Sequence, residues 1–344
     1  MSTCYAASRA GVLVVDIGAT EADGDAAGVA AGPALTDHDV ECLDAAIDVP
    51  ERAFCGTFDA GLHRTIDGGK SWERVGSEPL PESVTSVTVA PHDPDVVYAG
   101  TEPSAVYRST DGGDTWEELS GLTDLPSAPE WSFPPRPDTH HVRWVEVDPS
   151  DPDHLYVAVE AGALIQTHDG GDTWEERSPT TRRDTHSMAI HPDAPDRVRA
   201  AAGDGYAESD DAGRNWTFPQ DGLKHRYCWS VAIDPGDPDR VLLSAAASAR
   251  RAHTPERAAS YLYRQDGSAN EVDATWERLD DAGVPTGEGV LRPTLSGGTE
   301  AGELFALTDR GLYRTGDGGG AFERVEIEWP ESFRERTTRG LAVV

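Results

Sequence analysis

The chain reads Thr65-Ile-Asp-Gly-Gly-Lys-Ser-Trp72, and the same eight-residue pattern returns at Ser109–Trp116 and Thr167–Trp174. Looser copies lie at 209–216 and 315–322, and a stretched copy occupies 264–276. The central aspartates of the six copies lie 42 to 58 residues apart and are Asp67, Asp111, Asp169, Asp211, Asp266 and Asp317. A repeat of roughly 40–50 residues is typical of propellers and solenoids.

The second repeat indicates what one unit contains. An alternating apolar segment at 86–90 is followed by Pro91-His-Asp-Pro94, whose residues favour a tight turn. Two more strand-like segments follow at 96–100 and 105–108. The glycines of Asp111-Gly-Gly113 supply the positive φ that a hairpin turn needs, and a fourth strand returns at 116–119. Four antiparallel strands per repeat predict one blade of a β-propeller.

The two ends of the chain supply the parts of a seventh blade. Residues 340–344 resemble a first strand without a successor, whereas 3–8 and 11–15 resemble a second and a third strand. We place a degenerate fourth strand and a loop in 18–33. Pairing the two ends within one blade would close the ring and hide two sheet edges that otherwise invite association.

We therefore predict an all-β fold, a seven-bladed β-propeller of four-stranded antiparallel blades, closed by a blade that the N- and C-termini share. The repeats span nearly the whole chain, so we expect residues 1–344 to form a single domain. Two segments depart from the repeat, 121–140 between two blades and 245–260 within one, and we interpret both as loop insertions.

Acidic residues dominate the charge of the chain. There are 62 Asp and Glu against 29 Lys and Arg, which gives a net charge of −33. This charge repels nucleic acid and anionic membrane surfaces, so neither is an expected partner. Only Lys70 and Lys224 are lysine, and every other basic residue is arginine. High acid content with almost no lysine favours a halophilic protein, whose carboxylates retain water at high salt.

Composition and motifs also indicate the compartment. The four cysteines show no C-x-x-C spacing, so neither a zinc site nor a disulfide framework is predicted. The first residues lack the basic and apolar segments of a signal peptide, and no apolar run approaches the ~20 residues of a membrane helix. We expect a cytoplasmic, monomeric protein that needs no cofactor and does not insert into a membrane.

The S/T-x-D-x-G-x-S/T-W pattern resembles the Asp-box, or BNR repeat, of sialidases. Similar boxes occur in xyloglucanases, in sortilin-type receptors and in photosynthesis-assembly factors. The resemblance covers most of the chain and implies a β-propeller, but it implies little about activity, because in this family the box is a structural hairpin far from the active site. The residues agree with that role, since the aspartate can bond its own turn amides and the tryptophan can pack between sheets.

Arginine, histidine and tryptophan gather on the face opposite the repeated turns. The Asp-box turns and the Pro-Asp turns share one face, so the segments that enter the first strands open on the other face. Arg143, His186 and Trp229 fall at the same register of these segments. The residues that we predict to bind a ligand are Arg143, Trp144, His186, His225, Arg226, Trp229, Arg292, Arg336 and Arg339.

Guanidinium groups hold carboxylates and phosphates bidentately, so this set predicts an anion-binding pocket. The alternative is that the arginines only neutralise acids packed around the channel. Such acids reach the same face from the turns between second and third strands, at Asp59, Glu102, Glu160, Asp204 and Asp309. Glu160 and Asp204 lie in neighbouring blades and are candidates for the general acid and base of glycoside cleavage. Equivalent acids in equivalent turns are also explained by turn chemistry alone.

Histidines of the same face could bind a metal with Asp204 or Glu160. The weak candidates are His140, His186 and His225, with His141 and His253 nearby. None of them has a metal-type spacing within one element, so no metal is predicted.

Three functions remain open at this point. The first is a non-catalytic module that binds a small anion, a glycan or a protein partner on the Arg/His/Trp-rich face. The second is a glycosyl hydrolase or lyase. Resemblance to sialidases implies an arginine triad, imitated by Arg143, Arg226, Arg292 and Arg339, and a tyrosine nucleophile, Tyr206 or Tyr227, but their R-I-P motif is absent. The third is an assembly scaffold like the photosystem factors.

Overall fold

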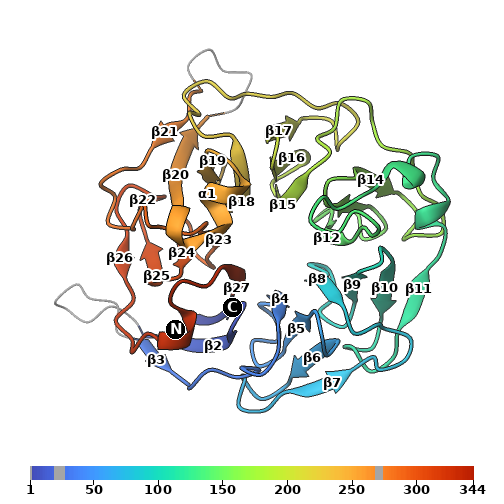
Figure 1. Cartoon of the computed structure of the whole chain (residues 1–344), viewed down its shortest axis with the longest axis horizontal. Coiled ribbons are helices and arrows are strands. Elements are labelled where there is room, and N and C mark those ends of the chain that lie inside the picture. Colours follow the sequence, from blue (N-terminus) through green and yellow to red (C-terminus); the bar gives the residue numbers. More distant parts are fainter. Residues whose placement is uncertain (1, 19–27, 268–273) are drawn as a thin grey trace.

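Seven small antiparallel sheets stand in a ring (Figure 1). Their innermost strands line a central channel. This computed structural model describes residues 2–18, 28–267 and 274–344. The predicted all-β, seven-bladed propeller is confirmed. No helix in the described ranges combines the length and the apolar character needed to cross a membrane.

Three blades are built from four consecutive strands ordered from the channel outward. The first blade contains β4 (Val40–Ala45), β5 (Ala53–Thr57), β6 (Leu62–Thr65) and β7 (Glu73–Val75). The second contains β8 (Val84–Val89), β9 (Val97–Thr101), β10 (Val106–Ser109) and β11 (Glu117–Leu119). The sixth contains β23 (Thr294–Gly297), β24 (Leu304–Thr308), β25 (Gly311–Thr315) and β26 (Glu323–Arg324).

In the third and fourth blades the outermost strand is reduced to a single bridge. The third contains β12 (Val142–Val147), β13 (Leu155–Val159) and β14 (Ala163–Thr167), and the fourth contains β15 (Thr185–His191), β16 (Ala194–Ala202) and β17 (Gly205–Ser209). The bridges join Gln166 to Glu175 and Glu208 to Thr217. Pro179 and Pro219 follow shortly after these bridges, and a proline cannot donate to a strand ladder.

The fifth blade carries an addition. It contains β18 (Tyr227–Asp234), β19 (Asp237–Ala246), β20 (Ala259–Asp266) and β21 (Glu277–Arg278), and β22 (Gly287–Glu288) also pairs with β20. The predicted insertion at 245–260 joins β19 to β20 and contains α1 (Ala249–His253) and η3 (Pro255–Arg257). The insertion at 121–140 contains η1 (Leu122–Asp124) and η2 (Ala128–Glu130), and η4 (Glu331–Phe333) precedes the last strand.

The seventh blade joins the two ends of the chain, as predicted. Its order is β27 (Thr338–Val343), β1 (Ser2–Ser8), β2 (Gly11–Ile17) and β3 (Gly28–Ala30). Cys4 pairs with Val343 in this ladder. The short β3 falls within the predicted fourth-strand segment, of which residues 19–27 lie outside the described residues. Side chains of β1 pack against both neighbouring blades, which ties the ends into the ring.

The repeated boxes are hairpins closed by their own aspartates. The carboxylate of Asp111 accepts hydrogen bonds from the Ser109 hydroxyl at 2.8 Å, the Thr115 amide at 2.8 Å and the Thr115 hydroxyl at 2.6 Å. The bonds from Thr115 lower the pKa of Asp111 to about 2. Equivalent bonds from their own turns are made to Asp67, Asp169, Asp211 and Asp317.

Asp266 differs from the other five box aspartates. Its carboxylate accepts from Arg240 Nε at 2.9 Å and pairs with Arg264 Nε at 3.0 Å, so it contacts arginines of β19 and β20. The turn of this stretched copy runs through 268–273, outside the described residues. Trp276, at its end, is buried and donates from Nε1 to the Pro219 carbonyl.

The box turns and the Pro-Asp turns lie on one face, as the sequence indicates. The amide of Gly112 donates to the Asp95 carbonyl, and the amide of Gly170 donates to the Asp153 carbonyl, each at 2.9 Å. These bonds join a box turn to the first-to-second-strand turn of the same blade. The opposite face therefore collects the loops that enter each innermost strand.

Candidate functional site

A β-bulge recurs at the same place in the innermost strand of six blades. In each one the pairing register with the second strand shifts and leaves one residue unpaired. Such a bulge redirects a side chain and often lies near a functional site. The six bulge residues, which we call the mouth ring, are Glu41, Thr85, Arg143, His186, Trp229 and Arg339. The sixth blade contributes Arg292, two residues before β23, instead of a bulge.

The mouth ring opens into a channel of about 620 Å³ that runs through the centre of the propeller. The innermost strands of all seven blades line it. Arg143, His186, Trp229 and Arg339 are among the lining residues, and so are prolines of the Pro-Asp turns at 91, 149, 192 and 235. The channel therefore reaches from the mouth ring to the face that carries the boxes.

Two arginines from different blades pack against the indole ring of Trp229. The Cζ of Arg292 lies 3.4 Å from the centroid of the Trp229 ring, and that of Arg143 lies 4.9 Å away. A guanidinium held over an indole face is stabilised by the negative charge of the π-system. His186 and His253 also pack on this indole, at centroid distances of 4.4 and 4.8 Å. The tryptophan is thus the centre of a cationic cluster.

Arg292 is buried without a carboxylate partner among the described residues. Its Nη1 donates to the Thr338 carbonyl at 2.8 Å and its Nε to His253 Nδ1 at 3.1 Å, while Nη2 has no hydrogen-bond partner in that part of the chain. The residue is only 1% exposed. Burial, followed by the charges of Arg339 and Arg143, lowers the pKa of Arg292 well below its usual value. The fold therefore holds a costly cation at the mouth.

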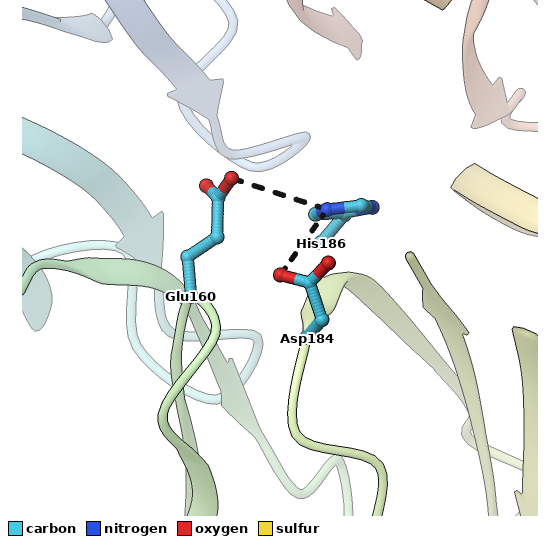
Figure 2. Close-up of side chains that lie close together, drawn as sticks. All are labelled: Glu160, Asp184 and His186. Carbon is cyan, nitrogen blue, oxygen red and sulfur yellow. Dashed lines mark ion pairs between the residues drawn. The ribbon is translucent and has the colours of Figure 1, made fainter. Parts of the chain in front are cut away.

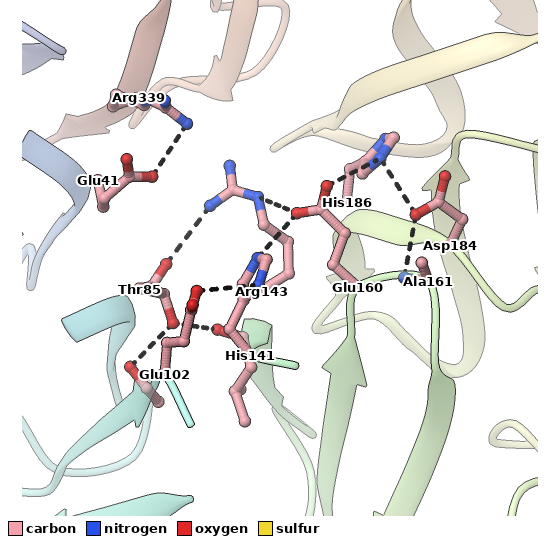
Figure 3. Close-up of polar contacts among 12 residues, drawn as sticks. Glu41, Thr85, Glu102, His141, Arg143, Glu160, Ala161, Asp184, His186 and Arg339 are labelled. Carbon is pink, nitrogen blue, oxygen red and sulfur yellow. Dashed lines mark hydrogen bonds and ion pairs between the residues drawn. The ribbon is translucent and has the colours of Figure 1, made fainter. Parts of the chain in front are cut away.

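Two carboxylates balance part of this charge. Glu41 pairs with Arg339 Nη1 at 3.0 Å, and Glu160 lies 3.8 Å from Arg143 Nε (Figure 3). The Nε atoms of Arg143 and Arg339 still lack hydrogen-bond partners within the described residues. Two carboxylates thus balance three guanidinium groups only in part, and some buried N–H donors have no hydrogen-bond partner among the described residues.

Glu160 stands between histidines. His141 Nε2 contacts its Oε2 at 3.0 Å, and His186 Nε2 lies 4.0 Å from its Oε1. Burial alone would raise the pKa of Glu160, but the hydrogen bond from His141 and the charges of His141, His186 and Arg143 hold it well below its usual value. Asp184, whose Oδ1 is 3.7 Å from His186 Nε2, lies beside it (Figure 2). Burial raises the pKa of Asp184, and the charge of Glu160 adds to that rise.

Two further carboxyl groups line the channel below the mouth ring. The Trp144 indole donates to Glu146 Oε2 at 2.7 Å, and the Val89 amide donates to Asp44 Oδ2 at 2.8 Å. Burial raises the pKa of Glu146 to about 8, with the charge of Asp44 contributing. Burial also raises the pKa of Asp44 to about 6.

The structure brings together five of the predicted ligand-binding residues: Arg143, His186, Trp229, Arg292 and Arg339. It separates the others. Trp144 turns into the channel towards Glu146, and His225 stacks on Tyr261 at a centroid distance of 4.0 Å. The side chains of Arg226 and Arg336 are exposed. These last three lie one or two residues before their strands begin, so the path of a loop, not strand alternation, sets their direction.

The predicted acid pair is rearranged. The Asp204 side chain is 48% exposed and pairs with Arg182 at 3.7 Å, so it lies outside the contacts of Glu160. Asp184, which directly precedes β15, lies beside Glu160 instead of Asp204. Among the weak metal candidates only His186 joins Glu160, whereas His140 packs edge-on against Trp131.

Sequence reasoning missed Glu41, Thr85 and Asp184, and it named His141 only as a neighbour of the metal candidates and not as a partner of Glu160. The first two carry a readable signal, because Val40-Glu-Cys-Leu43 and Val84-Thr-Ser-Val87 align with Val142-Arg-Trp-Val145. Extending that register to every blade would have found the whole mouth ring. Asp184 has no such signal, since it lies in a loop whose length varies from blade to blade.

The fold has known counterparts of low sequence similarity. No protein-family model matches the chain, and no curated protein matches it. The GH74 enzyme of Niastella koreensis superposes with a TM-score of 0.66 at 16% identity, over 92% of this chain and 51% of that one. An ancestral GH74 enzyme gives 0.60 at 15% identity, over 89% and 38%. The chain thus spans about half the length of these enzymes, or less.

YCF48 from Cyanidioschyzon merolae is similar in size as well as in fold. It superposes with a TM-score of 0.57 at 16% identity, over 85% of this chain and 86% of that one. A further structure shows YCF48 bound to a D1 peptide, with a TM-score of 0.55 at 16% identity, over 83% and 81%. These likenesses establish a shared β-propeller fold.

Proposed function

We propose that this propeller binds an anionic ligand at the channel mouth, through Arg143, Arg292 and Arg339. Arg292 carries the proposal, because it is a buried guanidinium with a free Nη2 donor and no acidic partner among the described residues. A carboxylate or phosphate would supply the missing charge and could accept two parallel N–H bonds. The site would thus recognise the acidic group of a small molecule, a glycan or a protein partner.

A protein partner is one form that this ligand could take. The YCF48 propeller is similar in fold and in length, and one of its structures contains a bound D1 peptide. That precedent supports the scaffold alternative, in which an acidic side chain or a terminal carboxylate of a partner would occupy the mouth.

The carbohydrate-active alternative has less support. The GH74 enzymes are at least about twice as long as the matched region, and the likeness is one of fold. Asp204, one half of the predicted catalytic pair, is exposed and paired with Arg182. We therefore favour binding over hydrolysis.

Calorimetric titration with inorganic phosphate and with glucuronate tests the proposal. In Arg292→Met the affinity should fall about 30-fold or more, because a desolvated charge partner is lost. Arg292→Lys keeps the charge but not the fork, and should bind with intermediate affinity. Arg336→Ala is the control, since that arginine is exposed. Equal affinity in the wild type and Arg292→Met would refute the assignment, and so would a loss in Arg336→Ala alone.

A further inference from the structure

One ring nitrogen of His186 faces two carboxylates, those of Asp184 and Glu160. Its Nδ1 donates to the Cys228 carbonyl at 2.7 Å, and its side chain is fully buried against Tyr227 and Trp229. The opposite nitrogen, Nε2, has no hydrogen-bond partner in the described ranges. A histidine whose Nδ1–H is held by a backbone carbonyl has a fixed ring and directs the Nε2 lone pair outward, as metal-bound histidines do.

The spacing of the three groups is too wide for hydrogen bonds. Nε2 lies 3.7 Å from Asp184 and 4.0 Å from Glu160 (Figure 2). A charge-assisted N–H···O bond would draw a carboxylate to about 2.7–2.9 Å. One donor atom from each residue lies within 4.8 Å of the others, in the only such group of three among the described residues. A central ion with bonds of about 2.0–2.6 Å can therefore reach all three after shifts of a few tenths of an ångström.

The surroundings hold each carboxylate in place. His141 contacts Glu160 Oε2 at 3.0 Å, which leaves Oε1 facing His186. The Ala161 amide donates to Asp184 Oδ1 at 3.1 Å (Figure 3). Gly203 leaves room for the other oxygen, because a Cβ at that position would lie 2.0 Å from Asp184 Oδ2. Glu160 follows β13 and Asp184 precedes β15, so two adjacent blades supply the group.

We propose that Glu160, Asp184 and His186 bind one divalent transition-metal ion, with Zn²⁺ or Mn²⁺ as the expected occupant. An imidazole nitrogen with two carboxylates suits these ions better than Mg²⁺ or Ca²⁺, which favour oxygen ligands alone. Three protein ligands leave a position for water or for a ligand atom, as in catalytic zinc sites. The Asp184 side chain is 31% exposed, which gives the ion a route in from solvent. This site adjoins the arginine cluster, since Glu160 also lies 3.8 Å from Arg143 Nε, but metal binding there does not require a bound anion.

Chelator-treated full-length protein should bind Zn²⁺ at a one-to-one ratio in calorimetric titration, and its thermal midpoint should rise with Zn²⁺ concentration. Mn²⁺ binding is followed by loss of the electron paramagnetic resonance signal of the free ion. Asp184→Asn and Glu160→Gln should weaken binding about 100-fold or more. Asp204→Asn is the matched control, because Asp204 lies in a neighbouring loop but pairs with Arg182.

His186→Gln removes the nitrogen ligand and should have the same effect, and circular dichroism verifies that each variant is folded. Binding that is lost in Asp184→Asn and kept in Asp204→Asn supports the site. No saturable binding, equal affinity in Asp184→Asn, or Ca²⁺ binding tighter than Zn²⁺ would overturn it. Loss of phosphate binding in Arg292→Met would be a separate result, so the two proposals can fail independently.

Discussion

The box turns and the mouth ring each consist of one structural position that recurs in most blades, but the two sets differ in how similar the residues at that position are. The boxes repeat nearly the same residues, and each described box aspartate other than Asp266 binds its own turn. The mouth ring repeats only a backbone bulge, and its side chains range from Glu41 to Trp229. The residues that recur in the boxes thus stabilise the propeller scaffold. The mouth ring recurs only as a backbone position, and its different side chains together form an asymmetric site.

The two sets also differ in how fully their polar groups are satisfied. Asp111 accepts three hydrogen bonds from its own hairpin. At the mouth, Arg143, Arg292, Arg339 and His186 each keep a buried nitrogen without a hydrogen-bond partner among the described residues. Buried polar groups without hydrogen bonds cost free energy, so we expect changes in the boxes to reduce stability and changes at the mouth to affect binding more than folding.

The largest effect on stability should come from a box glycine. Gly69 has a φ of +81°, and a Cβ there would lie 2.4 Å from Val14 Cγ2. Gly69→Ala should lower the free energy of unfolding by about 2–4 kcal/mol, through left-handed strain and overpacking. Gly68→Ala is the matched control, since its φ is +72° but nothing lies within 4 Å. It should cost about 1–2 kcal/mol in urea unfolding. Equal costs would show that contact with the shared blade contributes nothing.

The box aspartate Asp111 and the channel residue Glu146 should change stability with pH in opposite directions, and both effects should be smaller than that of Gly69→Ala. The pKa of Asp111 is lowered, so its contribution is lost as pH falls through about 4 to 2. The pKa of Glu146 is raised to about 8, so the folded protein keeps a proton there that the unfolded chain releases above about 4.5. The free energy of unfolding therefore falls between pH 5 and 8 on account of Glu146.

Glu146→Gln should remove that fall. The variant keeps an oxygen to accept from the Trp144 indole, and at pH 8.5 it should be more stable than the wild type by about 1 kcal/mol, a modest figure because the channel admits water. Near pH 5 the two should match in urea unfolding. Glu118→Gln on β11 is exposed and should show no such difference. A gap that stays constant from pH 5 to 8.5 would contradict the role of Glu146.

The smallest effect on folding should be at Arg292. Methionine removes an uncompensated buried charge but also leaves the Thr338 carbonyl without its donor, and these effects nearly cancel. Arg292→Met should therefore keep the free energy of unfolding within about 1 kcal/mol of the wild type in the absence of ligand. Destabilisation as large as that of Gly69→Ala would place Arg292 with the scaffold, and the contrast between the two faces would not hold.

The sequence allowed the ring and part of the site to be predicted, and the reason is local geometry. Turn residues and strand alternation mark each blade, and Gly340–Val344 shows the pattern of a first strand on its own. The alignment of Arg143, His186 and Trp229 is correct because all three lie within strands, each directly after the pair that precedes the bulge. A fixed register carries a side chain to the same place in every blade.

The rest depended on loops. Arg226 and Arg336 each lie three residues before a mouth-ring residue, outside the strand, where alternation no longer determines direction. Asp184 replaced Asp204 beside Glu160 because the loop before β15 folds back towards the Ala161 amide, a contact between blades that no local pattern encodes. The stretched box at Asp266 shows the same limit, since its partners come from two strands of its own blade.

The shared blade has a consequence for biosynthesis. Each of the first six blades is one contiguous segment and can form once that segment has left the ribosome. The ladder between β1 and β27 pairs Cys4 with Val343, so it must wait until Val343 has been synthesised. Throughout translation β1 presents an unpaired edge that other nascent chains could extend. Pairing with β27 therefore removes the edge of β1 at which misassembly could begin.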